Sequence, residues 1–311
     1  MTKRAINEAM PVVEPQPYVE DDASGEMWNL MLGDSCERLA DIPDNSIDLS
    51  VYSPPFASLF TYSPSDRDLG NSSDRSAFIE HFSFILSEML RVTKPGRNSC
   101  VHVQQITTSK AAHGEIGLTD FRGDVIAAHI AAGWTFYGEV TVNKDPQAQA
   151  IRTKAHCLMF ATLDRDSAAN RPALADYLLI FKKPGDNEVP VKPDVTRDEW
   201  IDWAQPIWWN IRESDTLNYQ TAKEDADERH ICPLQLPFID RCVRLWSNPG
   251  ETVLSPFAGI GSEGVMSVKR GRRFIGCELK PSYWASGVKN LTRAEYESQM
   301  PTLLDDLETQ A

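Results

Sequence analysis

The chain has 311 residues, 41% of them hydrophobic and 24% charged, as expected for a globular protein with a large buried core. No run of about 18 uncharged apolar residues occurs, and residues 1–20 lack the apolar segment of a secretory signal, so we expect no membrane span. The formal net charge is −14. The six cysteines form no CxxC pair, so a zinc ribbon or a disulfide framework is not expected, and we expect the protein in the reducing cytoplasm.

Positive charge is concentrated in one segment of this acidic chain. Residues 151–185 carry six basic and three acidic side chains, whereas residues 1–70 and 186–230 are strongly acidic. Binding to a nucleic-acid backbone requires local positive charge rather than a protein that is basic overall. The charge pattern therefore permits a DNA partner, with its expected contact near residues 151–185.

The predicted elements of the first two thirds alternate between strands and helices. Residues 1–26 are rich in proline and acidic side chains and are predicted to form a loose N-terminal arm. A strand over 47–52 ends at Ser53-Pro54-Pro55-Phe56, because proline cannot continue a hydrogen-bonded ladder. Apolar spacing then predicts, in order, a helix over 76–91, a strand over 100–103, a helix over 124–132, and strands over 134–142 and 177–181.

The segment 186–230 is polar, acidic and irregular, apart from one helix indicated by the capping box of Thr196 and Glu199. It also holds four tryptophans, namely Trp200, Trp203, Trp208 and Trp209. These side chains could form an apolar cluster that fixes the segment to the core, or a wall that stacks on nucleic-acid bases.

Regular alternation returns in the last third of the chain. The pattern predicts a helix over 237–246, a strand over 251–254, a helix over 264–270, a strand over 273–277 and a helix over 281–296. Strands that alternate with helices predict an α/β fold, with a mostly parallel sheet covered on both faces.

A glycine-rich motif, Gly259-Ile260-Gly261-Ser262-Glu263-Gly264, lies between a predicted strand and a predicted helix. Its glycines allow a ligand to approach the backbone, and Glu278, which ends the next strand, can accept hydrogen bonds from ribose hydroxyls. The motif alone does not distinguish a nicotinamide dinucleotide from another adenosyl cofactor. Because few residues follow Glu278, we expect the other strands to come from earlier in the chain, in a circularly permuted order.

A second motif, Ser53-Pro54-Pro55-Phe56, follows the predicted strand 47–52. The two prolines fix a rigid turn and remove two backbone donors, which leaves carbonyl oxygens and the serine oxygen as acceptors beside an aromatic ring. Such a turn suits an amino group on a flat ring, although the tetrapeptide by itself could equally be a stiff surface turn.

Together the two motifs resemble the β class of DNA amino-methyltransferases. Ser-Pro-Pro-Phe at 53–56, followed much later by Ser255-Pro256-Phe257-Ala258-Gly259-Ile260-Gly261-Ser262, is similar to the permuted motif order of that class. Three more segments resemble family elements: the Gly-Asp element at 32–35, the segment at 230–237 that touches the methionine end of S-adenosylmethionine, and the strand at 271–278 with its ribose acid.

The resemblance implies a Rossmann-like S-adenosylmethionine methyltransferase fold. Its mixed, mostly parallel, seven-stranded sheet would have circularly permuted motif order and inserted DNA-recognition segments. The implied organisation is an arm at 1–26, a catalytic domain of 27–142, 176–185 and 230–298, recognition insertions at 143–175 and 186–229, and a tail at 299–311.

The implied reaction is site-specific methylation of an exocyclic amino group, on a base flipped out of double-stranded DNA, with S-adenosylmethionine as methyl donor and no metal. Ser53 and the Pro54 carbonyl would accept the amino hydrogens, Pro55 would fix the turn, and Phe56 would stack on the base. Ser53 is a poor base, so the proton is expected to leave to solvent. The adenine 6-amino and cytosine 4-amino groups remain equal alternatives.

The resemblance also implies which residues bind the ligands. The cofactor contacts would be Asp34, Pro233, Leu234, Ser255, Phe257, Ala258, Gly259, Gly261, Ser262 and Glu278. Ser255 stands where the family usually has aspartate, so it should orient the cofactor amino group more weakly, or Asp34 compensates. The expected DNA contacts are Lys144, Arg152, Lys154, Arg165 and Arg171.

Other functions remain open at this point. An RNA or protein amide methyltransferase shares the chemistry, a nicotinamide-dependent oxidoreductase leaves the Ser-Pro-Pro-Phe motif unexplained, and a non-catalytic DNA-binding module needs no adenosyl pocket. Methylation of the cytosine ring carbon is disfavoured, because it needs a thiolate, typically in a Pro-Cys pair, and this chain has only Cys232-Pro233. By analogy with the class, we expect a bacterial or phage-encoded protein that forms a homodimer, with or without a restriction partner.

Overall fold

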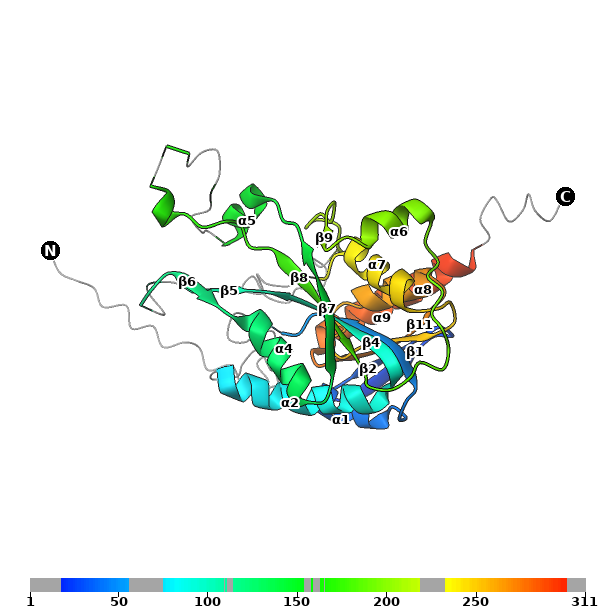
Figure 1. The fold of residues 1–311 in the computed structure, drawn as a ribbon. Helices are drawn as coiled ribbons and strands as arrows, with labels where there is room; N and C mark the ends of the chain where they lie inside the picture. The colour runs from blue at the N-terminus through cyan, green and yellow to red at the C-terminus, as the bar shows by residue number, and fades with distance from the viewer. Residues whose placement is uncertain are drawn as a thin grey trace.

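The computed structural model describes residues 18–55, 75–108, 110, 114–153, 158, 163–164, 166–218 and 233–300. These residues form an α/β fold around one large twisted sheet (Figure 1). In spatial order its strands are β1 (Asp21–Ser24), β2 (Trp28–Leu32), β11 (Arg273–Glu278), β10 (Thr252–Ser255), β3 (Ile47–Tyr52), β4 (Thr93–Gln104), β8 (Asp176–Lys182), β7 (Thr135–Val142) and β9 (Ile207–Trp208).

The centre of the sheet is parallel, and both flanks contain antiparallel pairs, although β7 and β9 pair in parallel. From β2 through β11, β10 and β3 to β4, every neighbouring pair is parallel. β8 is antiparallel to both β4 and β7, and β1 is antiparallel to β2. The order β11-β10-β3 joins strands from opposite ends of the chain, which confirms the expected permuted arrangement.

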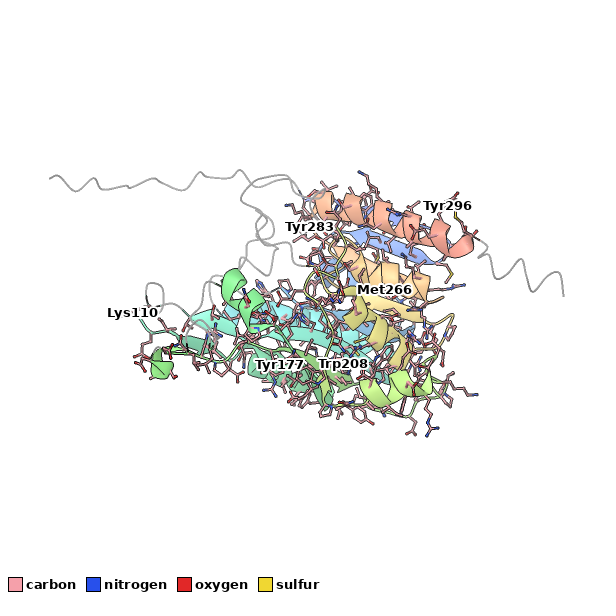
Figure 2. All side chains as sticks on the ribbon, turned by 90° about the horizontal axis from the view of Figure 1, so that it is seen from above. Lys110, Tyr177, Trp208, Met266, Tyr283 and Tyr296 are labelled. Carbon is pink, nitrogen blue, oxygen red and sulfur yellow. The ribbon has the colours of Figure 1, made fainter. Side chains whose placement is uncertain are left out.

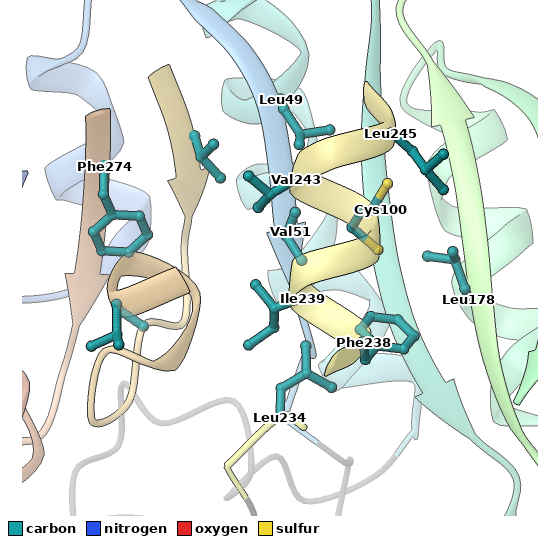
Figure 3. Close-up of a cluster of buried hydrophobic side chains, with 14 of the residues drawn as sticks. Leu49, Val51, Cys100, Leu178, Leu234, Phe238, Ile239, Val243, Leu245 and Phe274 are labelled. Carbon is teal, nitrogen blue, oxygen red and sulfur yellow. The ribbon is translucent and has the colours of Figure 1, made fainter. Parts of the chain in front are cut away.

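Helices cover both faces of this sheet (Figure 1). One face carries α7 (Leu236–Trp246), α8 (Ser262–Lys269) and α9 (Pro281–Gln299), and the other carries α1 (Ser35–Arg38), α2 (Arg75–Val92) and α4 (Phe121–Ala131). Strand residues alternate between the two layers, so Leu178 and Ile180 join the α7 side whereas Leu179 and Phe181 join the α2 side. In Figure 3, Phe238, Ile239 and Val243 of α7 pack over β3 and β4.

The remaining described elements are short, and one of them, the turn that begins at Leu39, reaches the core. They are the two-stranded sheet of β5 (Ile106–Thr108) and β6 (Gly117–Thr119), helix α5 (Pro146–Thr153), helix α6 (Arg197–Trp203), and short 3-10 turns at Leu39–Asp41 and Ser167–Ala169. No helix within the described ranges is long and apolar enough to cross a lipid bilayer.

The prediction of seven strands is wrong for this sheet, which has nine among the described residues. The residue pattern predicted six of these strands and missed β1, β2 and β9, of which β1 and β9 lie at the edges and have weak sequence signals. β1 consists of Asp-Asp-Ala-Ser, and β9 has only two residues. Residues 21–24 therefore belong to the sheet rather than to a loose arm, because the turn before Trp28 folds them back onto β2.

The segment 186–218 packs closely against the central body. Trp208 is 1% exposed and contacts the α7 side of the core, and Arg244 of α7 pairs with Glu199 of α6 at 2.8 Å. Trp200 and Trp209 are 50% and 48% exposed. Figure 2 shows Tyr283 and Tyr296 of α9 on one side of the molecule and Trp208 toward the other. The tryptophans thus divide into a buried cluster, which fixes the segment, and an exposed pair.

Candidate active site

The parallel strands end at one edge of the sheet, and the predicted site segments follow them directly. Ser53 follows β3, Phe257 follows β10, and Glu278 is the last residue of β11. β10 pairs in parallel with both β3 and β11, so the turn after β3 and the loop after β10 lie at the same edge. A ring contact joins them, since the centroids of Tyr52 and Phe257 lie 6.0 Å apart.

The carboxylate of Glu278 holds the glycine-rich loop in place. Its Oε2 accepts a hydrogen bond from the Gly259 N–H at 2.8 Å, and its Oε1 accepts one from the Lys280 N–H at 2.8 Å. Gly259 and Gly261 have φ values of +53° and +83°, in the region that glycine adopts without strain. Gly261 is also the N-cap of α8, so the first N–H groups of that helix lie at the end of the loop.

One feature of this loop fits an adenosyl group. A Cβ built on Gly259 would meet no atom within 4 Å, so the backbone is open to a ligand there. The hydroxyl oxygens of Ser255 and Ser262 are buried and have no hydrogen-bond partner among the described residues. Ser255 is 0% exposed, however, so its hydroxyl does not reach the surface of the loop in this structure.

The turn after β2 is bonded to the same loop. Asp34 is the N-cap of α1, and its Oδ1 accepts the Cys36 N–H at 2.9 Å. The Ser35 hydroxyl donates to the Pro256 carbonyl at 2.5 Å, and the Gly33 N–H donates to the Glu278 carbonyl at 2.9 Å. Ser35 was not among the predicted site residues, although it is the last residue of the Gly-Asp element at 32–35.

The segment that precedes α7 lies beside the end of β3. Pro233 is half-buried, whereas Leu234 is 5% exposed and packs in the core with Phe238 and Val51 (Figure 3). The Leu234 side chain is therefore a core contact in this structure. Residues 230–232 lie outside the described residues, and so does Phe56.

The Ser53 hydroxyl contacts a buried polar chain. Its Oγ lies 3.2 Å from His102 Nδ1 and 3.2 Å from the His102 carbonyl oxygen. His102 Nε2 lies 2.9 Å from Asp176 Oδ2, and the Gln104 amide donates to Asp176 Oδ1 at 2.7 Å. The sequence analysis missed His102 and Asp176. The signal available was a histidine near the end of the predicted strand 100–103.

Lys144 is not available to DNA phosphates in this structure, contrary to the sequence-based expectation. It is 5% exposed, and its Nζ lies 2.6 Å from Asp176 Oδ2. Burial by itself would raise the pKa of Asp176, but the charges and hydrogen bonds of His102 and Lys144 lower it to about 2. Removing Lys144 from this pair would leave an ionised carboxylate buried without its partner, which is strongly unfavourable.

The structure describes the other expected DNA contacts only in part. Arg171 is half-buried and donates to the Pro172 carbonyl at 3.3 Å. The backbone of Arg152 belongs to α5, and Lys154 and Arg165 lie outside the described residues. Within the described ranges, no three His, Cys, Asp or Glu side chains gather as a metal site would require.

The first turn of α8 contains a buried acidic residue, Glu263. Burial raises its pKa to about 8, a backbone hydrogen bond opposes the rise, and the carboxylate of Glu278 adds to it. The Glu263 side chain is therefore mostly neutral at pH 7.

The fold places the chain among α/β proteins that have a glycine-rich loop at the carboxyl edge of a mostly parallel sheet. A family model described as DNA methylase, for the N6 and N4 amino-methyltransferases, matches residues 47–289, which is most of the chain. The protein therefore belongs to this DNA methylase family.

Several curated proteins are similar to this chain. The type II methyltransferase M.BglI of Bacillus subtilis is 31% identical over 116 residues, or 37% of this chain and 30% of the relative. M.BamHI of Bacillus amyloliquefaciens is 22% identical over 291 residues, or 88% and 59%. The DNA adenine methyltransferase YhdJ of Escherichia coli (strain K12) is 38% identical over 74 residues, or 23% and 25%. The matches thus span less than two thirds of these relatives.

Solved structures share the fold. A putative DNA modification methylase from Thermus thermophilus, complexed with S-adenosyl-L-methionine, has a TM-score of 0.64 and 23% identity, covering 85% of this chain and 92% of that one. The PvuII DNA methyltransferase (cytosine-N4-specific) has a TM-score of 0.62 and 17% identity, covering 88% and 93%. These neighbours confirm the predicted Rossmann-like methyltransferase fold.

Proposed function

We propose that the protein transfers a methyl group from S-adenosylmethionine to the exocyclic amino group of a base flipped out of double-stranded DNA. The observation that carries this proposal is the position of two loops at one edge of the sheet, the Ser53-Pro54-Pro55 turn and the glycine-rich loop after β10. Membership of the DNA methylase family supports the same activity.

The cofactor would be held by the backbone of the loop 257–261 and by Glu278. The Glu278 carboxylate, oriented by two backbone N–H groups, would accept hydrogen bonds from ribose hydroxyls. Asp34 and Pro233 would lie beside the cofactor, and the buried side chains Leu234, Ser255, Ala258 and Ser262 would shape the site from below. When bound, the cofactor supplies a methyl group on a sulfonium centre.

The Ser53-Pro54-Pro55 turn would prepare the amino group for attack. The lone pair of an exocyclic amino nitrogen is delocalised into the ring, which makes this nitrogen a weak nucleophile. Acceptance of its two hydrogens by Ser53 Oγ and the Pro54 carbonyl would favour a pyramidal nitrogen, whose lone pair points at the methyl carbon. Proline has no N–H, so no backbone donor at 54 or 55 competes with this geometry. Stacking by Phe56 stays a prediction.

The proposal leaves the target base open between adenine and cytosine and assigns DNA recognition to two segments of the chain. Adenine and cytosine both carry an exocyclic amino group, and an acceptor turn alone suits either. Recognition would come from the insertions 143–175 and 186–229, with phosphate contacts from Arg152, Lys154, Arg165 and Arg171 and exposed aromatic surface from Trp200 and Trp209. A homodimer stays a prediction by analogy.

The test is methylation by the purified full chain. The chain is incubated with S-adenosylmethionine carrying a labelled methyl group and with duplex DNA, RNA or a protein mixture in separate reactions. We expect label in DNA, and digestion to nucleosides with mass spectrometry then separates N6-methyladenine from N4-methylcytosine. Label in RNA or protein with unlabelled DNA would contradict the proposal, and label on the cytosine ring carbon would contradict the amino chemistry.

A further inference from the structure

Behind Ser53, three side chains from different parts of the sheet form one continuous polar chain. His102 lies near the end of β4, Asp176 begins β8, and Lys144 follows β7. The distances are 3.2 Å from Ser53 Oγ to His102 Nδ1, 2.9 Å from His102 Nε2 to Asp176 Oδ2, and 2.6 Å from that oxygen to Lys144 Nζ. His102 and Asp176 are 8% and 4% exposed, so bulk water screens these contacts little.

The carboxylate of Asp176 determines which nitrogen of His102 carries hydrogen. Asp176 is ionised, so the Nε2 that faces it must donate, and the neutral imidazole then has an unprotonated Nδ1. That nitrogen faces Ser53, whose hydroxyl can donate to it or to the His102 carbonyl. Either way the hydroxyl hydrogen points toward His102, and the serine lone pairs point away from it, toward the edge of the sheet.

Two charged groups face His102 among the described residues. The charged groups that face it are Asp176 from β8 and Lys144 after β7, and these two neutralise each other. From α7 it meets the edge-on ring of Phe238, with centroids 5.2 Å apart. Ser53 approaches from the end of β3. A proton passed to His102 Nδ1 would produce an imidazolium next to the Asp176 carboxylate.

We propose that His102, oriented by Asp176 and Lys144, is a positioning residue that keeps Ser53 as a hydrogen-bond acceptor for the target amino group and then receives the proton released there. The inference rests on the proposed function. As the nitrogen–carbon bond forms and the carbon–sulfur bond breaks, the amino nitrogen gains positive charge. One of its protons then passes to Ser53 Oγ while the serine hydroxyl proton passes to His102 Nδ1, and His102 later releases it to solvent.

This assignment explains two features that the serine turn alone does not. A free serine hydroxyl could donate to the amino nitrogen and occupy the lone pair needed for attack, and the His102 contact prevents this. It also accounts for Lys144, whose buried ammonium balances the charge of Asp176 instead of binding DNA.

The first experiment is a double-mutant cycle in the full chain, with kcat for DNA methylation and the cofactor Kd measured separately. We expect Ser53→Ala and His102→Ala each to lower kcat on the order of 10²-fold, while the Kd changes less than about twofold. Because the two residues act as one unit, the double variant should lose no more than the more impaired single variant. His81→Ala, exposed on α2, is the matched control and should keep wild-type kcat.

The second variant, at His102, separates a role in positioning the Ser53 hydroxyl from a role in folding. His102→Asn retains an acceptor for the Ser53 hydroxyl but cannot be protonated near neutral pH. It should recover part of the kcat lost in His102→Ala, because the Ser53 hydroxyl keeps an acceptor there. A full rate in His102→Ala, strictly multiplicative losses in the double variant, or no recovery of kcat in His102→Asn would each overturn the proposal.

A third measurement needs no methylation. Nitrogen NMR of the full chain with labelled histidine should show His102 as the Nε2–H tautomer at neutral pH, with an Nδ1 signal that moves in Ser53→Ala. A protonated Nδ1 would overturn the proposal directly. If the wild-type chain methylates no DNA, the proposed function fails and the role of His102 in it fails too. If DNA is methylated and His102→Ala keeps full rate, only the His102 assignment fails.

Discussion

The Gly259 N–H donates a hydrogen bond of 2.8 Å to Glu278 Oε2, and so joins the loop after β10 to the last residue of β11. The other carboxylate oxygen accepts from the Lys280 N–H. The group expected to recognise ribose is thus also the group that orders the loop against which the ribose would lie. Loop geometry and cofactor affinity should therefore change together when Glu278 is altered.

Glu278→Gln tests this coupling. An amide presents one acceptor oxygen in place of two, so either Gly259 or Lys280 loses its partner, and the charge available to the ribose hydroxyls disappears. A hydrogen bond to a charged group contributes about 1.5–3 kcal/mol, so the cofactor Kd should rise roughly 10- to 100-fold in calorimetric titration. Glu297→Gln, on the far part of α9, is the control. Equal affinity of the two variants would remove Glu278 from the cofactor site.

Most of the fold could be predicted from the sequence, because the residue patterns that indicate its strands and helices are local. Each central strand is a short apolar run that ends in a turn motif, and the helices show clear apolar spacing. The edge strands gave no such signal, because β1 is polar and β9 has two residues whose pairing depends on β7. Their presence follows from tertiary packing rather than from local preference.

The site could be predicted from the sequence only where its residues belong to one contiguous motif. The serine turn and the glycine-rich loop are contiguous, so their residue types indicate their chemistry. The His102 chain arises instead from register: Gln104 and Val142 both pair with Asp176, which brings His102 and Lys144 to the same carboxylate. Lys144 was predicted to contact DNA because it is one of the basic residues of its segment. Such a prediction carries no information on the strand pairing that places Lys144 beside Asp176.

Gly261→Ala should cost both stability and affinity. At φ +83° a side chain is strained, and a Cβ there would lie 3.4 Å from Gly287 Cα of α9. We expect a loss of about 1–3 kcal/mol of unfolding free energy in urea denaturation, with a raised cofactor Kd. Gly250→Ala is a close match, since its φ is +81° and its Cβ would meet no atom within 4 Å. Gly250→Ala should lose comparable stability without any change in the cofactor Kd. If Kd rises equally in both variants, Gly261 has no local role in cofactor binding.

The packing of the segment 186–218 gives a third prediction. Trp208 is 1% exposed, stacks near Trp246 and donates from Nε1 to the Trp203 carbonyl at 2.9 Å. Trp208→Ala should therefore lower the unfolding free energy by about 3–5 kcal/mol, measured by chemical denaturation. Trp200→Ala, at a position 50% exposed, should change it by about 0.5 kcal/mol or less. Similar losses in both variants would show that the segment is held by its helix rather than by the buried tryptophan.

Glu263 makes stability depend on pH in a direction opposite to most carboxylates. Its pKa, about 8 in the folded chain, lies above the ordinary value of 4.5. The folded state therefore binds the proton more tightly, and the stability from neutral Glu263 is complete below about pH 4.5 and is lost as pH rises through about 8. Glu263→Gln has no such titration, so relative to the wild type it should gain a few kcal/mol of unfolding free energy between pH 5 and pH 9. Thermal and urea unfolding at both pH values measure the gain. Glu188→Gln, at an exposed position outside α8, controls for general loss of negative charge, and an equal pH response in Glu263→Gln and the wild type would show that Glu263 is ionised in the folded chain.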